Sequence, residues 1–358
     1  MIVKTGTTGT QGTLGTTGTR ALPAGKRDLV PVVPSVPCVP VVPGLTSEDW
    51  RELAAEEAAP LLAAEADAYR RELCWDVRPA WAPVEPARLS RALPGYVVRD
   101  GGGTIRGWTC FLDHHGVRQV AMLVSDTPLA TAALVERIVT APGAVGLRGE
   151  IVCVRDAAPG LADALRARRF DVSVYRYLSL SAFANRSGGP PIPRRDRAWR
   201  PDDLEAVVAL CARAYADSTD VRAFAPTGTS AEWLDYLTTM VSGTGCGTFM
   251  PDASFLVEGD DGGTLDAAVL TTDLGCGTAH IAQVVVDPVA RGRGLGRRLV
   301  DAVIGHARGH GCARVTLLVA DTNRAAGRLY DAAGFVDRAQ HIVAVRMRGL
   351  EKRVVLGF

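Results

Sequence analysis

The stretch that decides the fold is Val284-Val285-Val286-Asp287-Pro288, followed by Arg291-Gly292-Arg293-Gly294-Leu295-Gly296. The valine run is typical of the end of a buried strand, and an amphipathic helix is predicted to begin after the glycines. Glycines let the backbone approach a ligand closely, and the helix start adds the positive end of its dipole. The segment therefore predicts a cradle for a pyrophosphate group. Four arginines are placed to supply charge-assisted donors at its rim, namely Arg291, Arg293, Arg297 and Arg298.

The spacing Arg-x-x-Gly-x-Gly separates this cradle from two others. It is not the dinucleotide-binding Gly-x-Gly-x-x-Gly, and a P-loop would need a lysine. The chain has 40 basic residues but only three lysines, Lys4, Lys26 and Lys352. The chain between Gly44 and Glu351 therefore contains neither a P-loop lysine nor the Schiff-base lysine of a pyridoxal-phosphate enzyme.

A second block, from Asn323 to Phe335, carries Tyr330 seven residues after its asparagine. Asn323 lies 27 positions after Gly296, which leaves room for one helix and one strand between the two blocks. Gly334 fits the end of a helix in the left-handed conformation. Asn323 has an alternative interpretation as a helix N-cap and Tyr330 as a core aromatic, and both roles are compatible with function.

The two blocks together resemble the GNAT acyltransferases, well over Arg197–Arg348 and loosely over Leu45–Leu180. The resemblance implies direct acetyl transfer from acetyl-CoA to an amine, through a tetrahedral intermediate and with no covalent enzyme species. Tyr330 would be the acid that protonates the leaving thiolate. Main chain near Val284–Val286 would bind pantetheine and the oxyanion. The residues implied to contact acetyl-CoA are Val284, Val285, Val286, Arg291, Gly292, Arg293, Gly294, Leu295, Gly296, Arg297, Asn323 and Tyr330.

His280 is the candidate general base. In a regular strand it shares one face with Ala282, Val284 and Val286, and a neutral imidazole accepts a proton at physiological pH. A surface or structural histidine is the alternative interpretation. Asp273 is a weaker candidate base, and Gln283 cannot serve as one.

The 358 residues predict two domains rather than one. Residues 1–44 form a low-complexity tail, with glycine and then proline at every third position, which we expect to be disordered. A helix from Glu48 to Leu73, capped by Thr46 or Ser47 and interrupted at Pro60, opens a unit at 45–184. A linker follows at 185–196, and the same order of elements recurs at 197–350. The fold class is thus α/β (α+β), with two tandem GNAT-like units, each a mixed, mostly antiparallel sheet flanked by helices.

The first unit lacks the features that carry chemistry in the second. Its corresponding strand ends in Ser125-Asp126-Thr127-Pro128-Leu129, without the arginine and the glycine pattern. Alignment of Phe170 with Phe335 puts Ala158 at the asparagine position and Leu165 at the tyrosine position. The unit at 45–184 is therefore predicted to be degenerate, to bind no CoA productively, and to wall the acceptor site.

Charge and composition exclude several other functional classes. A formal charge of +1 gives no global attraction to nucleic acid or anionic membrane. The sequence shows neither a signal peptide nor an apolar run that spans a membrane, so a cytoplasmic protein is expected. The eight cysteines have no metal spacing, and adjacent His114 and His115 should point to opposite faces of an extended chain. No metal is expected, and the Gly-Cys-Gly turns at Cys246 and Cys276 suggest no thiol chemistry.

The predicted function is N-acetylation of a small molecule or a protein by a monomer or homodimer. The alternative is a catalytically silent sensor or scaffold that binds acetyl-CoA. The acceptor should meet Asp217–Thr229 and Arg338–Ile342, whose charges select no substrate class. Phe224, Trp233 and Tyr236 are expected either to line an aromatic pocket or to form core packing.

Overall fold

A computed structural model describes residues 44–182, 196–216, 218, 224–243, 246–260 and 262–348. In these ranges a mixed sheet of 13 strands has the order β1-β2-β3-β4-β5-β13-β6-β12-β11-β10-β9-β7, with β8 beside β10. The strands are β1 (Leu45–Asp49), β2 (Gly95–Asp100), β3 (Ile105–His114), β4 (Val117–Ser125), β5 (Gly149–Arg155), β6 (Asp171–Ser181), β7 (Asp196–Ala198), β8 (Thr248–Phe249), β9 (Phe255–Glu258), β10 (Leu265–Asp273), β11 (Thr278–Val286), β12 (Arg314–Ala320) and β13 (Val336–Met347). The α-helices are α1 (Ala55–Ala68), α2 (Arg78–Trp81), α3 (Val84–Leu89), α4 (Pro128–Thr140), α5 (Leu161–Ala167), α6 (Leu204–Ala214), α7 (Ser230–Val241), α8 (Leu295–Gly309) and α9 (Arg324–Ala333). The predicted tail lies outside the described residues except for Gly44, and the predicted linker except for Asp196.

Helices cover both faces of the sheet. On β6, Val172 and Val174 pack toward α4 and α5, whereas Leu178 and Leu180 pack toward α8 and α9. These residues have the same parity along the strand, so the four helices lie on one face. The opposite face carries α1 and α3 in the N-terminal half and α6 and α7 in the C-terminal half.

A shared irregularity supports the internal repeat. In the N-terminal half, the β3–β4 pairing skips Ala121, and the parallel pairing of β4 with β5 ends at Val120. In the C-terminal half, the β10–β11 pairing skips Ala282, and the parallel pairing of β11 with β12 ends at Ile281. Each half thus places a β-bulge directly after the last parallel pair, where a bulge bends the strand and strengthens its twist.

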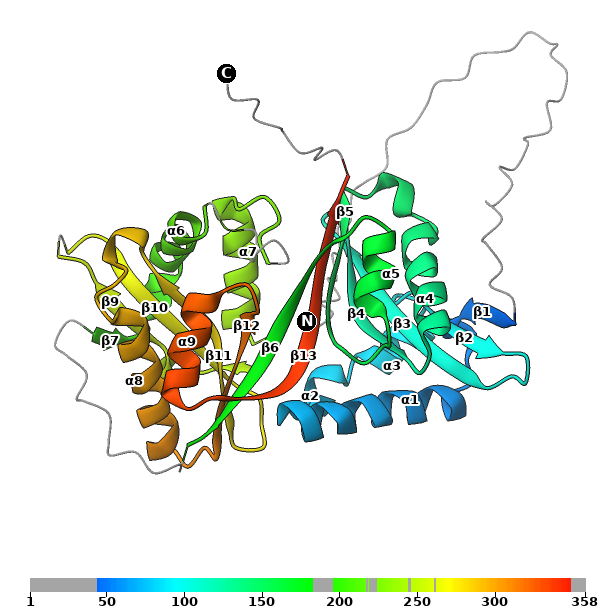
Figure 1. Ribbon diagram of the computed structural model, residues 1–358, viewed down its shortest axis with the longest axis horizontal. Helices are drawn as coiled ribbons and strands as arrows, with labels where there is room; N and C mark the ends of the chain where they lie inside the picture. Colours follow the sequence, from blue (N-terminus) through cyan, green and yellow to red (C-terminus); the bar gives the residue numbers. More distant parts are fainter. Residues whose placement is uncertain are drawn as a thin grey trace, which may run out of the picture.

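The closing strands of the two halves are exchanged. β6 and β13 pair with each other at the centre of the molecule (Figure 1). β6 then pairs with β12 of the C-terminal half, while β13 pairs with β5 of the N-terminal half. The predicted boundary between the units therefore does not coincide with a break in the sheet. Strand periodicity identifies a strand but not its neighbours, which is why the sequence did not reveal this pairing.

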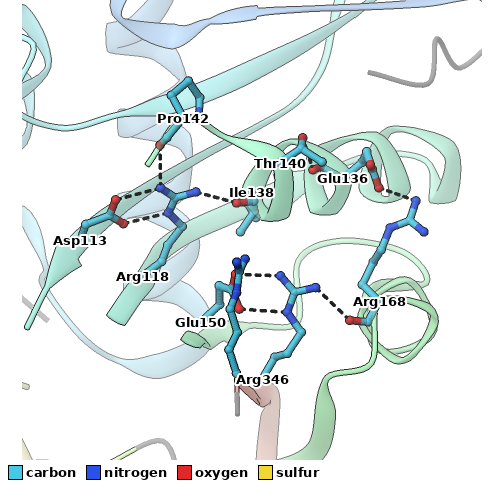
Figure 2. Close-up of polar contacts among 10 residues, drawn as sticks. Asp113, Arg118, Glu136, Ile138, Thr140, Pro142, Glu150, Arg168 and Arg346 are labelled. Atoms are coloured by element: carbon cyan, nitrogen blue, oxygen red, sulfur yellow. Dashed lines mark hydrogen bonds and ion pairs between the residues drawn. The ribbon is translucent and has the colours of Figure 1, made fainter. Parts of the chain in front are cut away.

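Buried ion pairs hold β13 against β5 of the N-terminal half. Glu150 of β5 is fully buried and pairs with Arg346 and Arg348 at 2.7 and 2.8 Å (Figure 2 shows the Arg346 pair). Burial alone would raise the pKa of Glu150, but the two guanidinium groups hold it below its ordinary value. Arg118, also buried, is paired with Asp113 and donates to the carbonyl of Ile138.

The start of the first unit differs from its prediction. Thr46 and Ser47 are not helix caps but lie in β1, paired with Arg99 and Val98. The α-helix begins only at Ala55 and continues through Pro60. A proline this close to a helix start removes one backbone hydrogen bond, and α1 tolerates the loss. α2, α3, β7 and β8 were not predicted. None of the helices in the described ranges has the length and apolar character needed to cross a membrane.

Candidate active site

The bulge at Ala282 changes which side chains of β11 share a face. Before the bulge Ile281 packs on the α8 face, and after it Val284 and Val286 pack on that same face. Val285 lies on the α6–α7 face together with Ala282. The expectation that His280 shares a face with Val284 and Val286 is therefore wrong, because it assumed unbroken alternation.

The bulge also opens the sheet. The last parallel pair is Ile281 with Leu317, and beyond it Leu318–Ala320 pair with β6 on the other side. Within the described residues, no ladder pair joins Ala282–Val286 to β12. The edge of β11 that faces β12 therefore carries backbone N–H and C=O groups available to an extended, amide-containing ligand.

The glycine-rich loop lies directly after this open edge. Gly292 and Gly294 have φ of +79° and +76°, in the left-handed region that favours glycine. A Cβ at either position would meet no atom within 4 Å, so a ligand can approach the backbone. Gly294 is the N-cap of α8 and provides no side-chain cap, which leaves the first amides of the helix for an anion. Leu295 is buried, and Gly296 faces Leu329 and Val286, where a Cβ would lie 3.4 and 3.7 Å from their side chains.

The four rim arginines all have partners in the protein. Arg291 donates to the carbonyl of Ala214 at 2.8 Å, which ties the loop to the end of α6. Arg293 lies 3.7 Å from Asp266, and Arg297 pairs with Asp301 at 2.7 Å. These pairs involve partly exposed side chains, for which the exchange of a carboxylate for a phosphate costs little. Arg298 differs, because it pairs with the buried carboxylate of Asp196 and so anchors β7 rather than the rim.

The second block folds as its spacing predicts. Asn323 caps α9, and its Oδ1 accepts from the backbone of Ala326 at 3.2 Å. Gly334 ends the helix with φ of +92°, and Phe335 packs edge-on against Tyr330 with ring centroids 5.8 Å apart. Burial raises the pKa of Tyr330 to about 12. The phenol is therefore protonated at neutral pH, which is the form that donates a proton.

Tyr215, which sequence reasoning missed, lies at the open edge of β11. Its hydroxyl donates to the carbonyl of Val284 at 3.0 Å, and the amide of Gln283 lies 2.6 Å from that hydroxyl. The ring stacks on Trp233 of α7 with centroids 5.3 Å apart, so Trp233 has the packing role. Burial raises the pKa of Tyr215 far above its ordinary value, with smaller electrostatic contributions from Cys211 and Tyr330, so the phenol is protonated at neutral pH. A tyrosine after an amphipathic helix gives no signal that could have predicted this contact.

His280 lies in a buried group at the junction of the two halves. Its Nδ1 is 3.0 Å from Thr316 Oγ1, which leaves Nε2 for a water or an amine. The ring of Tyr177 stacks against the rings of both His280 and His341, with centroids 5.8 Å apart in each case. Burial, with a contribution from His341, lowers the pKa of His280 to about 3. The imidazole is thus neutral but a weak base.

The corresponding region of the N-terminal unit is closed by its own chain. The backbone N–H of Ser125, at the end of β4, donates to the carbonyl of Ala157 at 3.3 Å. Thr131 Oγ1 lies 2.6 Å from Ser125 Oγ and donates to the carbonyl of Pro159 at 2.8 Å. The loop after β5 is therefore bonded to the strand end and to α4. In addition, the Thr127 side chain caps α4, and Pro128 at the helix start has no N–H to offer an anion.

Residues 219–335 match the Acetyltransferase (GNAT) family model, which covers the glycine-rich loop, Asn323 and Tyr330. This region of the chain is similar to the GNAT acetyltransferases. The matched GNAT region excludes the N-terminal unit and β13. The mixed α/β fold with two tandem GNAT-like units is confirmed, and the strand exchange adds a connection that the sequence did not predict.

Curated relatives are similar to part of this chain, and a solved structure shares its fold. Mycothiol acetyltransferase of Clavibacter sepedonicus is 34% identical over 173 residues, which are 47% of this chain and 49% of the relative. Glucosamine 6-phosphate N-acetyltransferase 1 of Oryza sativa subsp. japonica is 45% identical over 64 residues, 18% of this chain and 37% of the relative. The chain thus spans at most about half the length of these relatives. A GCN5-related glucosamine N-acetyltransferase region in a fungal multi-domain β-N-acetylglucosaminidase has the same fold, with a TM-score of 0.53 at 13% identity, over 86% of this chain and 38% of that one.

Proposed function

We propose that the C-terminal unit transfers an acetyl group from acetyl-CoA to an amine of a small molecule or a protein. The observation that carries the proposal is the open edge of β11 beside the glycine-rich loop. An extended ligand with amides along its length and a pyrophosphate at one end fits such an arrangement. We place the reaction in the cytoplasm, where acetyl-CoA is available.

The residues that would hold acetyl-CoA are divided between these two features. Main-chain groups of Val284, Val285 and Val286 would pair with the pantetheine amides. The backbone of Gly292–Arg297 would bind the pyrophosphate, with Arg291, Arg293 and Arg297 exchanging their present partners for phosphate oxygens. Asn323 orders the start of α9 and so positions Tyr330, which lies about two turns further along the helix.

The chemical step needs an acceptor for one proton and a donor of another. The neutral amine attacks the thioester carbonyl, and a tetrahedral intermediate forms with its negative oxygen on a backbone N–H near Val284–Val286. The C–S bond then breaks, and Tyr330 protonates the departing thiolate. His280 Nε2, directly or through a water, takes the proton of the amine. Because its pKa is about 3, His280 would act on the acidic ammonium of the intermediate rather than on the free ammonium.

We assign the N-terminal unit no acetyl-CoA site. The hydrogen bonds from Ser125 and Thr131 to the loop after β5 occupy the region that is open in the C-terminal unit. The N-terminal unit instead pairs its strand β5 with β13, and its Tyr177 forms a wall beside His280 and His341. The protein thus has one catalytic unit and one silent unit, and it functions as a monomer or a homodimer.

Calorimetric titration of acetyl-CoA into the full chain tests the site. We expect one site per chain, and affinity at least tenfold weaker in Arg291→Glu, since a carboxylate then faces the phosphates. Arg166→Glu on α5 is the control, because it makes the same charge change on the N-terminal unit. Two sites per chain would contradict the silent unit, and equal affinity in both variants would contradict the cradle.

Turnover separates the enzyme from a silent acetyl-CoA sensor. The first acceptors are glucosamine 6-phosphate and the amine acceptor of mycothiol acetyltransferase, taken from the names of the two relatives, followed by peptide amines. The acetylated product should be measured by mass spectrometry, because the eight cysteines of the chain interfere with thiol reagents. Tight binding of acetyl-CoA without an acetylated product across the panel would favour the sensor.

A further inference from the structure

The turn between β3 and β4 brings two histidine rings together. His115 has φ of +48°, in the left-handed region, and its ring centroid lies 3.9 Å from that of His114. The expectation that these side chains point to opposite faces is wrong, because it holds only for extended residues. The left-handed residue turns its side chain back toward its neighbour.

A carboxylate from the other unit joins this pair. One ligand atom from each of His114, His115 and Asp235 lies within 4.8 Å of the others, and all three side chains are exposed. Asp235 belongs to α7 of the C-terminal unit, whereas the histidines belong to the N-terminal unit. Among the described residues, this is the one group of three histidine, cysteine or acidic side chains with such a geometry.

We propose that His114, His115 and Asp235 bind a divalent transition-metal ion, zinc in the first place, which links the two units. Two imidazole nitrogens and a carboxylate oxygen suit zinc, cobalt, nickel or copper, whereas magnesium and calcium prefer oxygen ligands. Zinc bonds of about 2.0–2.1 Å in a tetrahedron place ligand atoms about 3.3 Å apart. Rotation of exposed side chains closes the gap from 4.8 Å, and water completes the coordination.

The surroundings hold the turn and leave these ligands free. The backbone of Arg148 donates to the carbonyl of Gly116, and its guanidinium donates to the carbonyl of His115, both at 2.6 Å. Asp113, the nearest other carboxylate in sequence, is held by Arg118 at 2.8 Å through both oxygens. The positive charge of Arg148 beside the turn makes the negative charge of Asp235 essential to a cation site.

The link has a consequence for the active site. Asp235 lies two residues from Trp233, which stacks on Tyr215. The Tyr215 hydroxyl in turn contacts the carbonyl of Val284 at the open edge of β11. A bound ion therefore restrains the helix that supports the acetyl-CoA edge. The metal site itself does not depend on the proposed acetyl transfer.

Calorimetric titration of zinc chloride into the metal-free full chain tests the inference. We expect one site whose affinity falls at least tenfold in Asp235→Asn and in His115→Gln. The control is the double variant His306→Gln, His310→Gln, because these residues form a second histidine pair at the C-terminal end of α8, with ring centroids 3.8 Å apart. That variant should retain the site. Cobalt should give the visible absorption of a low-coordinate nitrogen–oxygen site, and magnesium should not compete.

Thermal unfolding is a second measurement. It distinguishes an ion that links the two units through Asp235 from an ion bound by the two histidines alone. Zinc should raise the Tm of the wild type and leave that of Asp235→Asn unchanged, since a ligand stabilises only the state that binds it. Circular dichroism of the variants checks their fold, which these exposed positions should not disturb. Three results would overturn the proposal: no saturable binding, binding that Asp235→Asn leaves intact, or binding lost only in the α8 variant.

Discussion

Tyr330→Phe is the substitution that tests the proposed chemistry most directly. The change removes one hydroxyl and keeps the ring that packs at 5.8 Å against Phe335. The fold should therefore lose no more than about 1 kcal/mol. A positioned general acid contributes about 10²–10⁴-fold, so we expect kcat to fall by about that factor. The affinity for acetyl-CoA should stay within about twofold, because the ring still fills its place.

Single-turnover measurement of acetylated product is the assay, since it excludes a slow product release. The pKa of about 12 leaves about one phenol in 10⁴ ionised at pH 8. The rate of the wild type should therefore show no alkaline decline due to Tyr330 up to about pH 10. Tyr69→Phe is the matched control, because Tyr69 is a partly buried phenol packed on Trp75 and Trp81 in the N-terminal unit. Equal rates in Tyr330→Phe and wild type would refute the role of the acid.

Three further predictions concern the fold and the loop. Glu150→Gln should lower the free energy of unfolding by about 2 kcal/mol at pH 7, below the 3–5 kcal/mol of a fully buried pair because its arginines are partly exposed. The pKa of Glu150 is lowered in the folded state, so its carboxylate stabilises the fold at pH values above its ordinary pKa, and this stabilisation is lost as pH falls through the folded-state pKa. Urea unfolding should therefore show the difference in stability between wild type and Glu150→Gln disappearing below about pH 4. The pKa of His341 is lowered to about 4 by burial and by Arg155, and that of His280 to about 3, so wild-type stability should decrease between pH 6.5 and 4 by up to about 1.4 kcal/mol per pH unit for each histidine. His341→Gln should halve that slope, and a flat profile in the wild type would disprove the neutral pair. Gly294→Ala should cost about 1–2 kcal/mol at its φ of +76° and weaken acetyl-CoA binding about tenfold, whereas Gly305→Ala within α8 should stabilise the helix and leave binding unchanged.

The predicted site residues divide into those that local sequence could place and those that it could not. The loop at 291–296, the cap at Asn323 and the end of α9 at Gly334 depend on contacts within a few residues, and the structure has them as predicted. The face of His280 depends on the bulge at Ala282, which arises from the pairing of β11 with β10 and leaves no mark on the apolar pattern. The same limit applies to Tyr215, whose contact with Val284 joins residues far apart in sequence.

The sequence by itself determined the mixed α/β class, the two repeated units, and the loop and helix that make the C-terminal unit the candidate for chemistry. These follow from periodicity, glycine conformation and helix capping, which are local properties. Only the tertiary structure decided the exchange of β6 and β13, the open edge beyond Ile281, and the meeting of His114 and His115 with Asp235. Each of these joins segments distant in the chain, and such pairing is selected by the packing of the whole sheet rather than by any one stretch of residues.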